Sequence, residues 1–140
     1  MKTSILTLIL SGISTFLFAQ DPPQNVLTTF QDKFTNAKKI NWSREDASEW
    51  EAEFNLDDQK LSASFDSSGN WLETESKVKI NDLPEAVKSA LLNQYDDYKL
   101  RKIESIQSHS FDGYEIALKK GNVKVEVLAD LLGNFTEKHE

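Results

Sequence analysis

The chain contains no cysteine, so disulfide bonds, thiol catalysis and thiolate metal ligands are all excluded. It has only two histidines, and neither His109 nor His139 lies in the pattern of convergent partners that transition-metal sites and Ser-His-Asp triads require. A glycine-rich phosphate-binding loop and a nucleophile elbow are also missing from the sequence. We therefore expect a protein that is not an enzyme, with no catalytic residue, no metal ion and no cofactor.

Positive charge is scarce as well. The 140 residues include 16 Lys and Arg against 23 Asp and Glu, which gives a formal net charge of −7. Nucleic acids and anionic lipid surfaces are bound by clustered basic side chains. We therefore expect no nucleic-acid partner and no binding to a membrane surface.

The longest apolar run lies at the N-terminus, from residue 5 to residue 18, and follows Lys2. It is about fourteen residues long, which is short for a membrane span, and an acidic residue and two prolines follow it instead of a basic flank. This pattern is typical of a signal peptide. We expect cleavage after Ala19, a periplasmic or secreted location, and no membrane insertion after cleavage.

Two stretches of the chain resemble each other. The sequence FDSSGNWLETE at residues 65–75 returns 64 residues later as ADLLGNFTEKH at residues 129–139. At the same offset Glu51 matches Glu115, and apolar positions match apolar positions. The sequence therefore predicts a duplication, with one unit at residues 20–79 and a second at residues 80–140, together forming one compact body after a signal peptide at residues 1–19.

Each unit has the pattern of one helix followed by strands. Apolar residues at spacings of three and four predict an amphipathic helix after Asp21 and another after Asp82, with these aspartates as caps. Apolar and polar residues then alternate, which predicts half-buried antiparallel strands. The expected fold is α+β: two tandem α-β-β-β-β repeats that form an antiparallel sheet, with the helices packed on one face and the other face open to water.

The repeated Asp-x-x-Gly-Asn-aromatic motif has two interpretations. It is superficially similar to a calcium-binding loop. The second copy, however, has two leucines in place of Ser67 and Ser68 and keeps a single carboxylate. A tight turn explains every shared residue, because the Asp can bond the backbone two residues on, the Gly can adopt positive φ, and the aromatic residue can return the chain to the core. We predict a turn at both copies.

Glutamates alternate with apolar residues along the predicted strands. A glycosidase would need such a carboxylate pair in a cleft that raises one pKa, whereas these glutamates lie among Ser and Lys on a solvent-facing side. The three tryptophans align with apolar residues of the second unit, which favours core packing over ligand binding. The outward side chains that we predict to bind a partner are Glu51, Glu53, Ser62, Ser64, Glu115, Lys124 and Glu126.

Several motifs together resemble one family. These are NAKKINW at 36–42, WEAEF at 50–54, SASFDSSGNWLETE at 62–75 and LPEAV at 83–87. They are similar to the PepSY-like, β-lactamase-inhibitor-like family of small exported proteins, which is common in the Bacteroidetes. The resemblance implies two tandem helix-plus-sheet units, a periplasmic or secreted location and no established activity. The chain departs from the true β-lactamase inhibitor protein, which relies on disulfides.

The function that we expect is that of a non-enzymatic periplasmic or secreted binding module, inhibitor-like, with a protein or peptide as its partner. One alternative is a small-ligand or ion carrier with a pocket between helices and sheet, under Val26, Phe30, Val87 and Leu91. A sizeable cavity at those residues would favour the carrier, and a solid core would argue against it. A structural or stress-related envelope protein is a further alternative.

Overall fold

The computed structural model describes residues 21–138, so the predicted signal peptide and its cleavage after Ala19 lie outside the described residues. The first half of the fold contains α1 (Gln24–Lys33), β1 (Lys38–Arg44), β2 (Glu49–Leu56), β3 (Gln59–Asp66) and β4 (Trp71–Lys77). A short 3-10 helix, η1 (Ile80–Asp82), leads into the second half. That half contains α2 (Glu85–Gln94), β5 (Lys99–Ser108), β6 (Asp112–Lys120), β7 (Val123–Asp130) and β8 (Phe135–Glu137).

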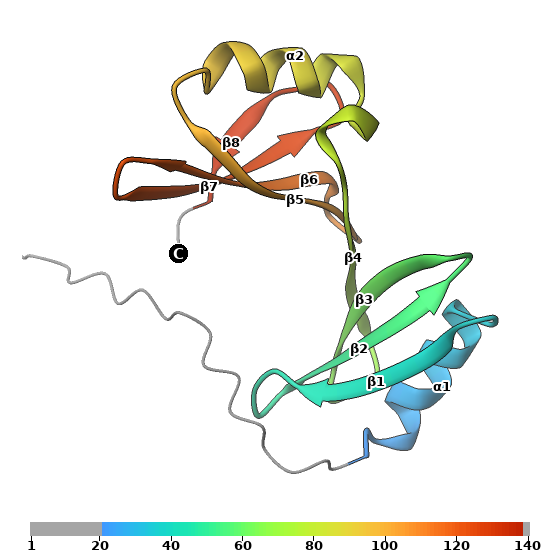
Figure 1. The fold of residues 1–140 in the computed structure, drawn as a ribbon. Helices are drawn as coiled ribbons and strands as arrows, with labels where there is room; N and C mark the ends of the chain where they lie inside the picture. The colour runs from blue at the N-terminus through green and yellow to red at the C-terminus, as the bar shows by residue number, and fades with distance from the viewer. Residues whose placement is uncertain (1–20, 139–140) are drawn as a thin grey trace, which may run out of the picture.

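All eight strands form one antiparallel sheet, and each strand pairs with its neighbour in sequence. One row of paired residues runs from Leu61 through Ser76, Ser105 and Tyr114 to Ala129. Leu61 packs in the cluster under α1 and Ala129 in the cluster under α2, so both helices cover the same face of the sheet. The helices lie at opposite ends of the molecule (Figure 1). An antiparallel α+β sheet with two helices on one face is therefore confirmed.

Two separate hydrophobic clusters hold the helices to the sheet. Phe30 of α1 packs edge-on against Phe54 of β2, with ring centroids 5.0 Å apart, in a cluster of aromatic side chains. The cluster under α2 is built from aliphatic side chains of that helix and of β5, β6 and β7. The residues that would surround a carrier's cavity, Val26, Phe30, Val87 and Leu91, are at most 3% exposed and pack inside these clusters. This arrangement favours a solid core.

The seam between the two clusters is polar. On the helix-covered face, β4 and β5 place Thr74 opposite Gln107 and Ser76 opposite Ser105. The two serine hydroxyls share a hydrogen bond of 2.8 Å. The halves are thus connected by the backbone hydrogen bonds of β4 with β5, by the Ser76–Ser105 hydrogen bond and by an edge-on contact of Trp71 with His109, with ring centroids 5.0 Å apart.

The predicted aspartate caps of the two helices are wrong. Pro23 and Pro84 occupy the N-cap positions, and neither helix has a side-chain hydrogen bond at its cap. Asp82 lies instead in η1. Proline suits a helix start because the first N–H groups have no partner inside the helix. The sequence signal for a helix start was therefore sound, while the residue that makes it was misassigned.

The Asp-x-x-Gly-Asn motif forms a turn after β3. The Oδ1 atom of Asp66 accepts hydrogen bonds of 2.9 Å from the backbone N–H groups of Ser68 and Asn70. The side-chain amide of Asn70 donates to Oδ2, also at 2.9 Å. Hydrogen bonds from Asn70 lower the pKa of Asp66. The predicted turn is confirmed, and both carboxylate oxygens are used inside it.

The second copy of the motif forms the same turn after β7. Asp130 accepts hydrogen bonds from the backbone N–H groups of Leu132 and Asn134 at 2.9 Å and 3.0 Å, and from the Asn134 amide at 2.7 Å. Gly69 and Gly133 have φ values of 85° and 83°, which glycine adopts without strain. Each turn also lies against the helix of its own half, through Asn25 of α1 and Ala86 of α2.

Replacement of the second turn glycine should show how tightly α2 closes over this turn. A Cβ atom at Gly133 would lie 2.6 Å from the backbone oxygen of Ala86. We expect Gly133→Ala to lower the free energy of unfolding by about 2–4 kcal/mol, from left-handed strain and the clash together. Urea denaturation measures the change.

Gly121 supplies the control for this measurement. It has φ 57° in the two-residue turn between β6 and β7, and a Cβ there would meet nothing within 4 Å. Gly121→Ala should therefore lower the free energy of unfolding only by the strain of the left-handed backbone, about 1–2 kcal/mol. If the two substitutions lower the free energy of unfolding equally, a close contact between α2 and the turn is contradicted.

Candidate functional site

The face of the sheet opposite α1 and α2, called here the helix-free face, carries a row of polar side chains across the first half. Glu51 of β2 pairs with Ser64 of β3, and Ser64 pairs with Glu73 of β4. The flanking residues Ala63 and Phe65 are buried under α1, so the alternation of the strand directs this row to the helix-free face. Ser64 is only 8% exposed although no helix covers it.

A second row runs parallel to the first. Glu53 of β2 pairs with Ser62 of β3, Ser62 pairs with Glu75 of β4, and Glu75 pairs with Ile106 of β5. Ile106 is buried on this face. Glu53 forms an exposed ion pair with Lys60, at 2.9 Å between Nζ and Oε2. The row thus extends the polar surface up to the seam between the halves.

The second half adds two carboxylates to the helix-free face. Glu104 of β5 pairs with Glu115 of β6 in the sheet. Each has its own lysine: Lys102 lies 2.6 Å from Glu104, and Lys138 lies 2.6 Å from Glu115, measured between Nζ and Oε2. Lys102 and Lys138 therefore already form ion pairs with carboxylates of the second half.

Burial raises the pKa of Glu75 to about 7. The neighbouring charges of Glu104, Glu73 and Glu115 contribute to this increase, and Lys102 opposes it. Glu75 therefore titrates near neutral pH. Acids from both halves of the protein therefore act on this one carboxylate.

The carboxylates at the two ends of the first row are also perturbed. Burial raises the pKa of Glu51, with Glu45 as the largest charge contribution. Burial likewise raises the pKa of Glu73, where Glu49 adds to the effect. Within residues 21–138, none of Glu51, Glu73 and Glu75 forms an ion pair. The face thus holds three partly buried carboxylates without an ion-pair partner in the described chain, and the charges of Lys102 and Lys138 oppose the raised pKa values of Glu75 and Glu73 only in part.

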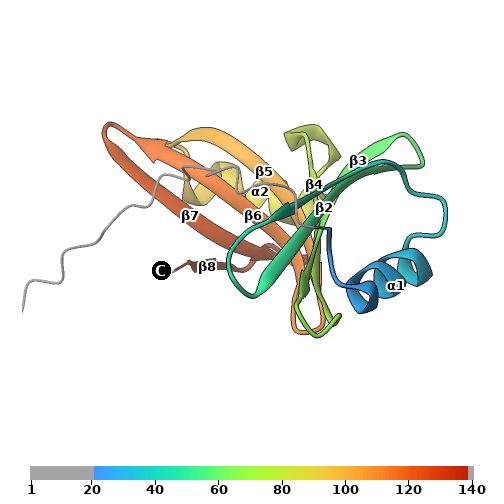
Figure 2. The same cartoon turned by 90° about the horizontal axis from the view of Figure 1, so that it is seen from below.

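The seven side chains that we predicted to bind a partner all lie on the helix-free face by strand alternation, but they do not form one group. Glu51, Glu53, Ser62 and Ser64 are neighbours on β2 and β3. Lys124 and Glu126 lie on β7, where they pair with Lys119 and Ala117. Lys124 is close to the β6–β7 turn, which projects away from α1 (Figure 2).

The prediction omitted three residues that are central to this surface: Glu73, Glu75 and Glu104. The alternation in the WLETE stretch places Glu73 and Glu75 on the polar side, so this signal was available. Glu104 joins them only because β4 pairs with β5. No group of three or more acidic or histidine side chains in the described part of the chain is arranged to hold a metal ion.

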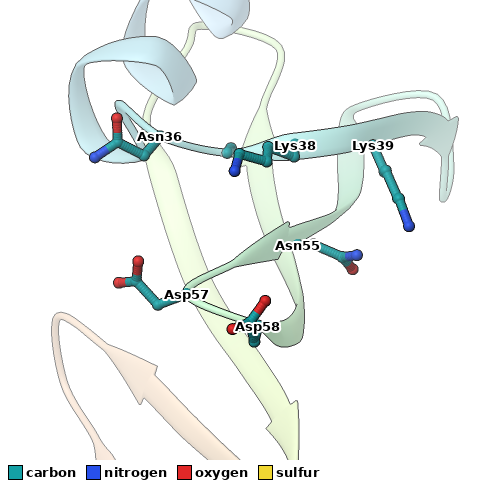
Figure 3. Close-up of a pocket in the computed structure, with 7 residues that line it drawn as sticks. Asn36, Lys38, Lys39, Asn55, Asp57 and Asp58 are labelled. Atoms are coloured by element: carbon teal, nitrogen blue, oxygen red, sulfur yellow. The ribbon is translucent and has the colours of Figure 1, made fainter.

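A shallow depression lies at the edge of the first half (Figure 3). Its volume is about 610 Å³, and it is lined by Asn36, Ala37, Lys38, Lys39, Asn55, Asp57 and Asp58. Asp57 and Asp58 have positive φ because they form the two-residue turn between β2 and β3. The lining comes from the α1–β1 connection, β1, the end of β2 and this turn, not from the space between helix and sheet where we placed the carrier's pocket.

The fold defined by this sheet and its two helices is that of BLIP-like proteins, named for the β-lactamase inhibitor protein. The crystal structure of a BLIP-like protein from Bacteroides fragilis matches with a TM-score of 0.77 and 23% identity, over 86% of this chain and 87% of that one. A DUF2874 family protein from Bacteroides ovatus matches with a TM-score of 0.75 and 20% identity, over 85% and 89%. A protein from Bacteroides eggerthii described as "putative periplasmic" has a TM-score of 0.71 and 18% identity, over 84% and 90%.

The family is shown by sequence as well. The model of the family described as "Putative beta-lactamase-inhibitor-like, PepSY-like" matches residues 48–137, and the chain belongs to this family. The resemblance drawn from the sequence motifs is thereby confirmed. No curated protein matches the chain. Among the described residues, no helix is long and apolar enough to cross a membrane.

The perturbed titration of Glu75 should appear in the stability of the protein. The folded state holds the Glu75 proton more tightly than the unfolded chain, whose pKa is near 4.5, so stability falls as the pH rises from about 4.5 to about 7. Glu75→Gln removes this loss. Allowing for solvent screening, we expect the free energy of unfolding of the variant to be higher than that of wild type by on the order of 1 kcal/mol at about pH 8. At about pH 4 the two free energies should be nearly equal.

Urea denaturation followed by tryptophan fluorescence tests this prediction at both pH values. Glu53→Gln is the matched control, because Glu53 lies in the same row as Glu75 and has only an exposed ion pair with Lys60. It should change the free energy of unfolding by less than about 0.5 kcal/mol. A Glu75→Gln variant that is no more stable than wild type at the higher pH would show that Glu75 ionises without cost.

Proposed function

We propose that this protein is a non-enzymatic, exported binding module whose helix-free face binds a protein or peptide that carries positive charge. The observation that carries the proposal is the set of three partly buried carboxylates, Glu51, Glu73 and Glu75, with no ion-pair partner in the described chain. Like charges held together in a partly desolvated surface repel each other. A cationic partner would remove this repulsion and gain charge-assisted hydrogen bonds.

The extent of the helix-free face supports a partner of the size of a protein. The helix-free face extends over strands of both halves and joins two polar rows to a buried apolar residue, Ile106. An interface of standard size buries about 800 Å² on each partner, and a face of several strands can supply such an area. Of the predicted residues, Glu51, Glu53, Ser62, Ser64 and Glu115 are the ones that we place in this interface. Lys124 and Glu126 would extend it along β7.

The family assignment supports the class of function. Members are described as β-lactamase-inhibitor-like, and one protein of the same fold is described as periplasmic. Together with the signal-peptide pattern at residues 1–19, this favours export to the periplasm or secretion. We infer an inhibitor-like role for the same reason: the helix-free face would block the protein that it binds.

The two halves of the chain also favour the predicted duplication. Each half contains a helix followed by four strands, and each has the same hydrogen-bonded turn at Asp66 or Asp130. We propose that residues 20–79 and 80–140 are tandem repeats that form one body. The acidic surface lies where the repeats meet.

Partner capture tests the proposed function. The purified protein is immobilised and exposed to a periplasmic extract of a Bacteroides species, and the retained proteins are identified by mass spectrometry. Wild type should retain a basic protein, and retention should weaken as salt is added because the contact is electrostatic. The double variant Glu73→Lys/Glu75→Lys should lose it, because the face then repels a cation.

The matched control places the same charge change elsewhere. Asp32 on α1 and Asp96 after α2 are exposed and lie off the strands of the helix-free face. Asp32→Lys/Asp96→Lys should retain the same protein as wild type. If all three forms retain the same set of proteins, the helix-free face is not the binding surface.

A further inference from the structure

We propose that Glu51, Ser64 and Glu73 form a subsite that binds the primary ammonium group of a lysine side chain. This inference rests on the proposed function, because the lysine belongs to the partner that the helix-free face binds. It adds the chemical group recognised and the residues that recognise it.

Ser64 is the observation that separates this subsite from a general acidic surface. The residue is 8% exposed, yet its hydroxyl makes no hydrogen bond with any side chain or backbone group of residues 21–138. Elsewhere in the sheet, the hydroxyls of Ser76 and Ser105 bond each other at 2.8 Å. A buried polar group is normally paired, so an unpaired hydroxyl at this depth indicates a place for a ligand.

The Ser64 oxygen can also be reached. In the described chain, no side-chain nitrogen or oxygen is both fully enclosed and without a hydrogen-bond partner. The unpaired Ser64 oxygen must therefore be accessible, and strand alternation aims it to the helix-free face. It forms the floor of a small polar site with a carboxylate on each side.

The spacing of the three groups suits one ammonium. Glu51, Ser64 and Glu73 are direct neighbours on three adjacent strands, where paired side chains start about 5 Å apart. A lysine ammonium has three N–H donors and no acceptor. One donor to the serine oxygen and one to each carboxylate would use all three. The two hydrogen bonds to carboxylates are charge-assisted, which makes them the stronger kind.

The parallel row is less suited to a ligand, although it has the same residue types. Its Glu53 already forms an ion pair with Lys60, so among the described residues only one carboxylate of that row lacks an ion-pair partner. Ser62, unlike Ser64, is not buried. In the first row, neither Glu51 nor Glu73 has an ion-pair partner in the described chain. The raised pKa values of Glu51 and Glu73 agree with a site that lacks its cation.

The experiment measures the dissociation constant of a tetralysine peptide for the purified protein at low salt, by NMR titration of backbone amides. Wild type should bind, and a peptide with all four lysines acetylated should not. Glu51→Gln/Glu73→Gln should weaken binding about tenfold or more, and Ser64→Ala about three- to tenfold, as expected for lost hydrogen bonds to a charged group. The largest amide shifts should fall on residues of β2, β3 and β4 around Ser64.

Carboxylates that lie off the helix-free face supply the control. Asp32→Asn/Asp96→Asn should change the dissociation constant by less than about twofold. If the first-row variants bind as well as this control, the subsite is overturned. In that case, loss of the peptide from Glu73→Lys/Glu75→Lys would leave the proposed function standing. Binding that survives in every variant would overturn both proposals.

Discussion

The pairing of β4 with β5 is the constraint on which the rest of the structure depends. Each half has its own helix and its own hydrophobic cluster, and no apolar contact of this strand pair joins the clusters. Backbone hydrogen bonds between Glu73–Lys77 and Glu104–Ser108 turn two small sheets into one. The same pairing brings acids of the second half beside Glu75, so the charged surface of the first half continues into the second.

The two faces of the sheet differ at the seam between β4 and β5. On the helix-covered face, the hydroxyl groups of Ser76 and Ser105 form a hydrogen bond of 2.8 Å, which stabilises the fold. On the helix-free face, burial and the charges of glutamates from both halves raise the pKa values of Glu73 and Glu75, so the ionised forms of these two carboxylates are disfavoured. Lys102 and Lys138 form ion pairs with Glu104 and Glu115, and their charges offset only part of the increase in the pKa values of Glu75 and Glu73. An isolated chain thus retains an excess of negative charge over its central strands, which suits the binding of a cation.

The sequence was most informative where structure depends on neighbours in the chain. Alternation predicted the strands, helical spacing predicted α1 and α2, and the Asp-x-x-Gly-Asn turns follow from bonds within five residues. The sequence could not predict the burial of Ser64 or the place of Glu104, because both depend on pairing with other strands and on how the sheet curves. The presence of each helix was predicted, but its start lies two residues later than the predicted aspartate cap, with proline at the cap position.

The order of strands has a consequence for how the chain folds. Because β1 to β8 lie in the sheet in the order of the sequence, every strand pairs only with its neighbours. Contacts that are local in sequence need little loop closure before they form, and such topologies fold quickly. The first half can therefore complete its sheet and its core before the second half has formed. Its last strand, β4, then offers an open edge that β5 covers when it folds.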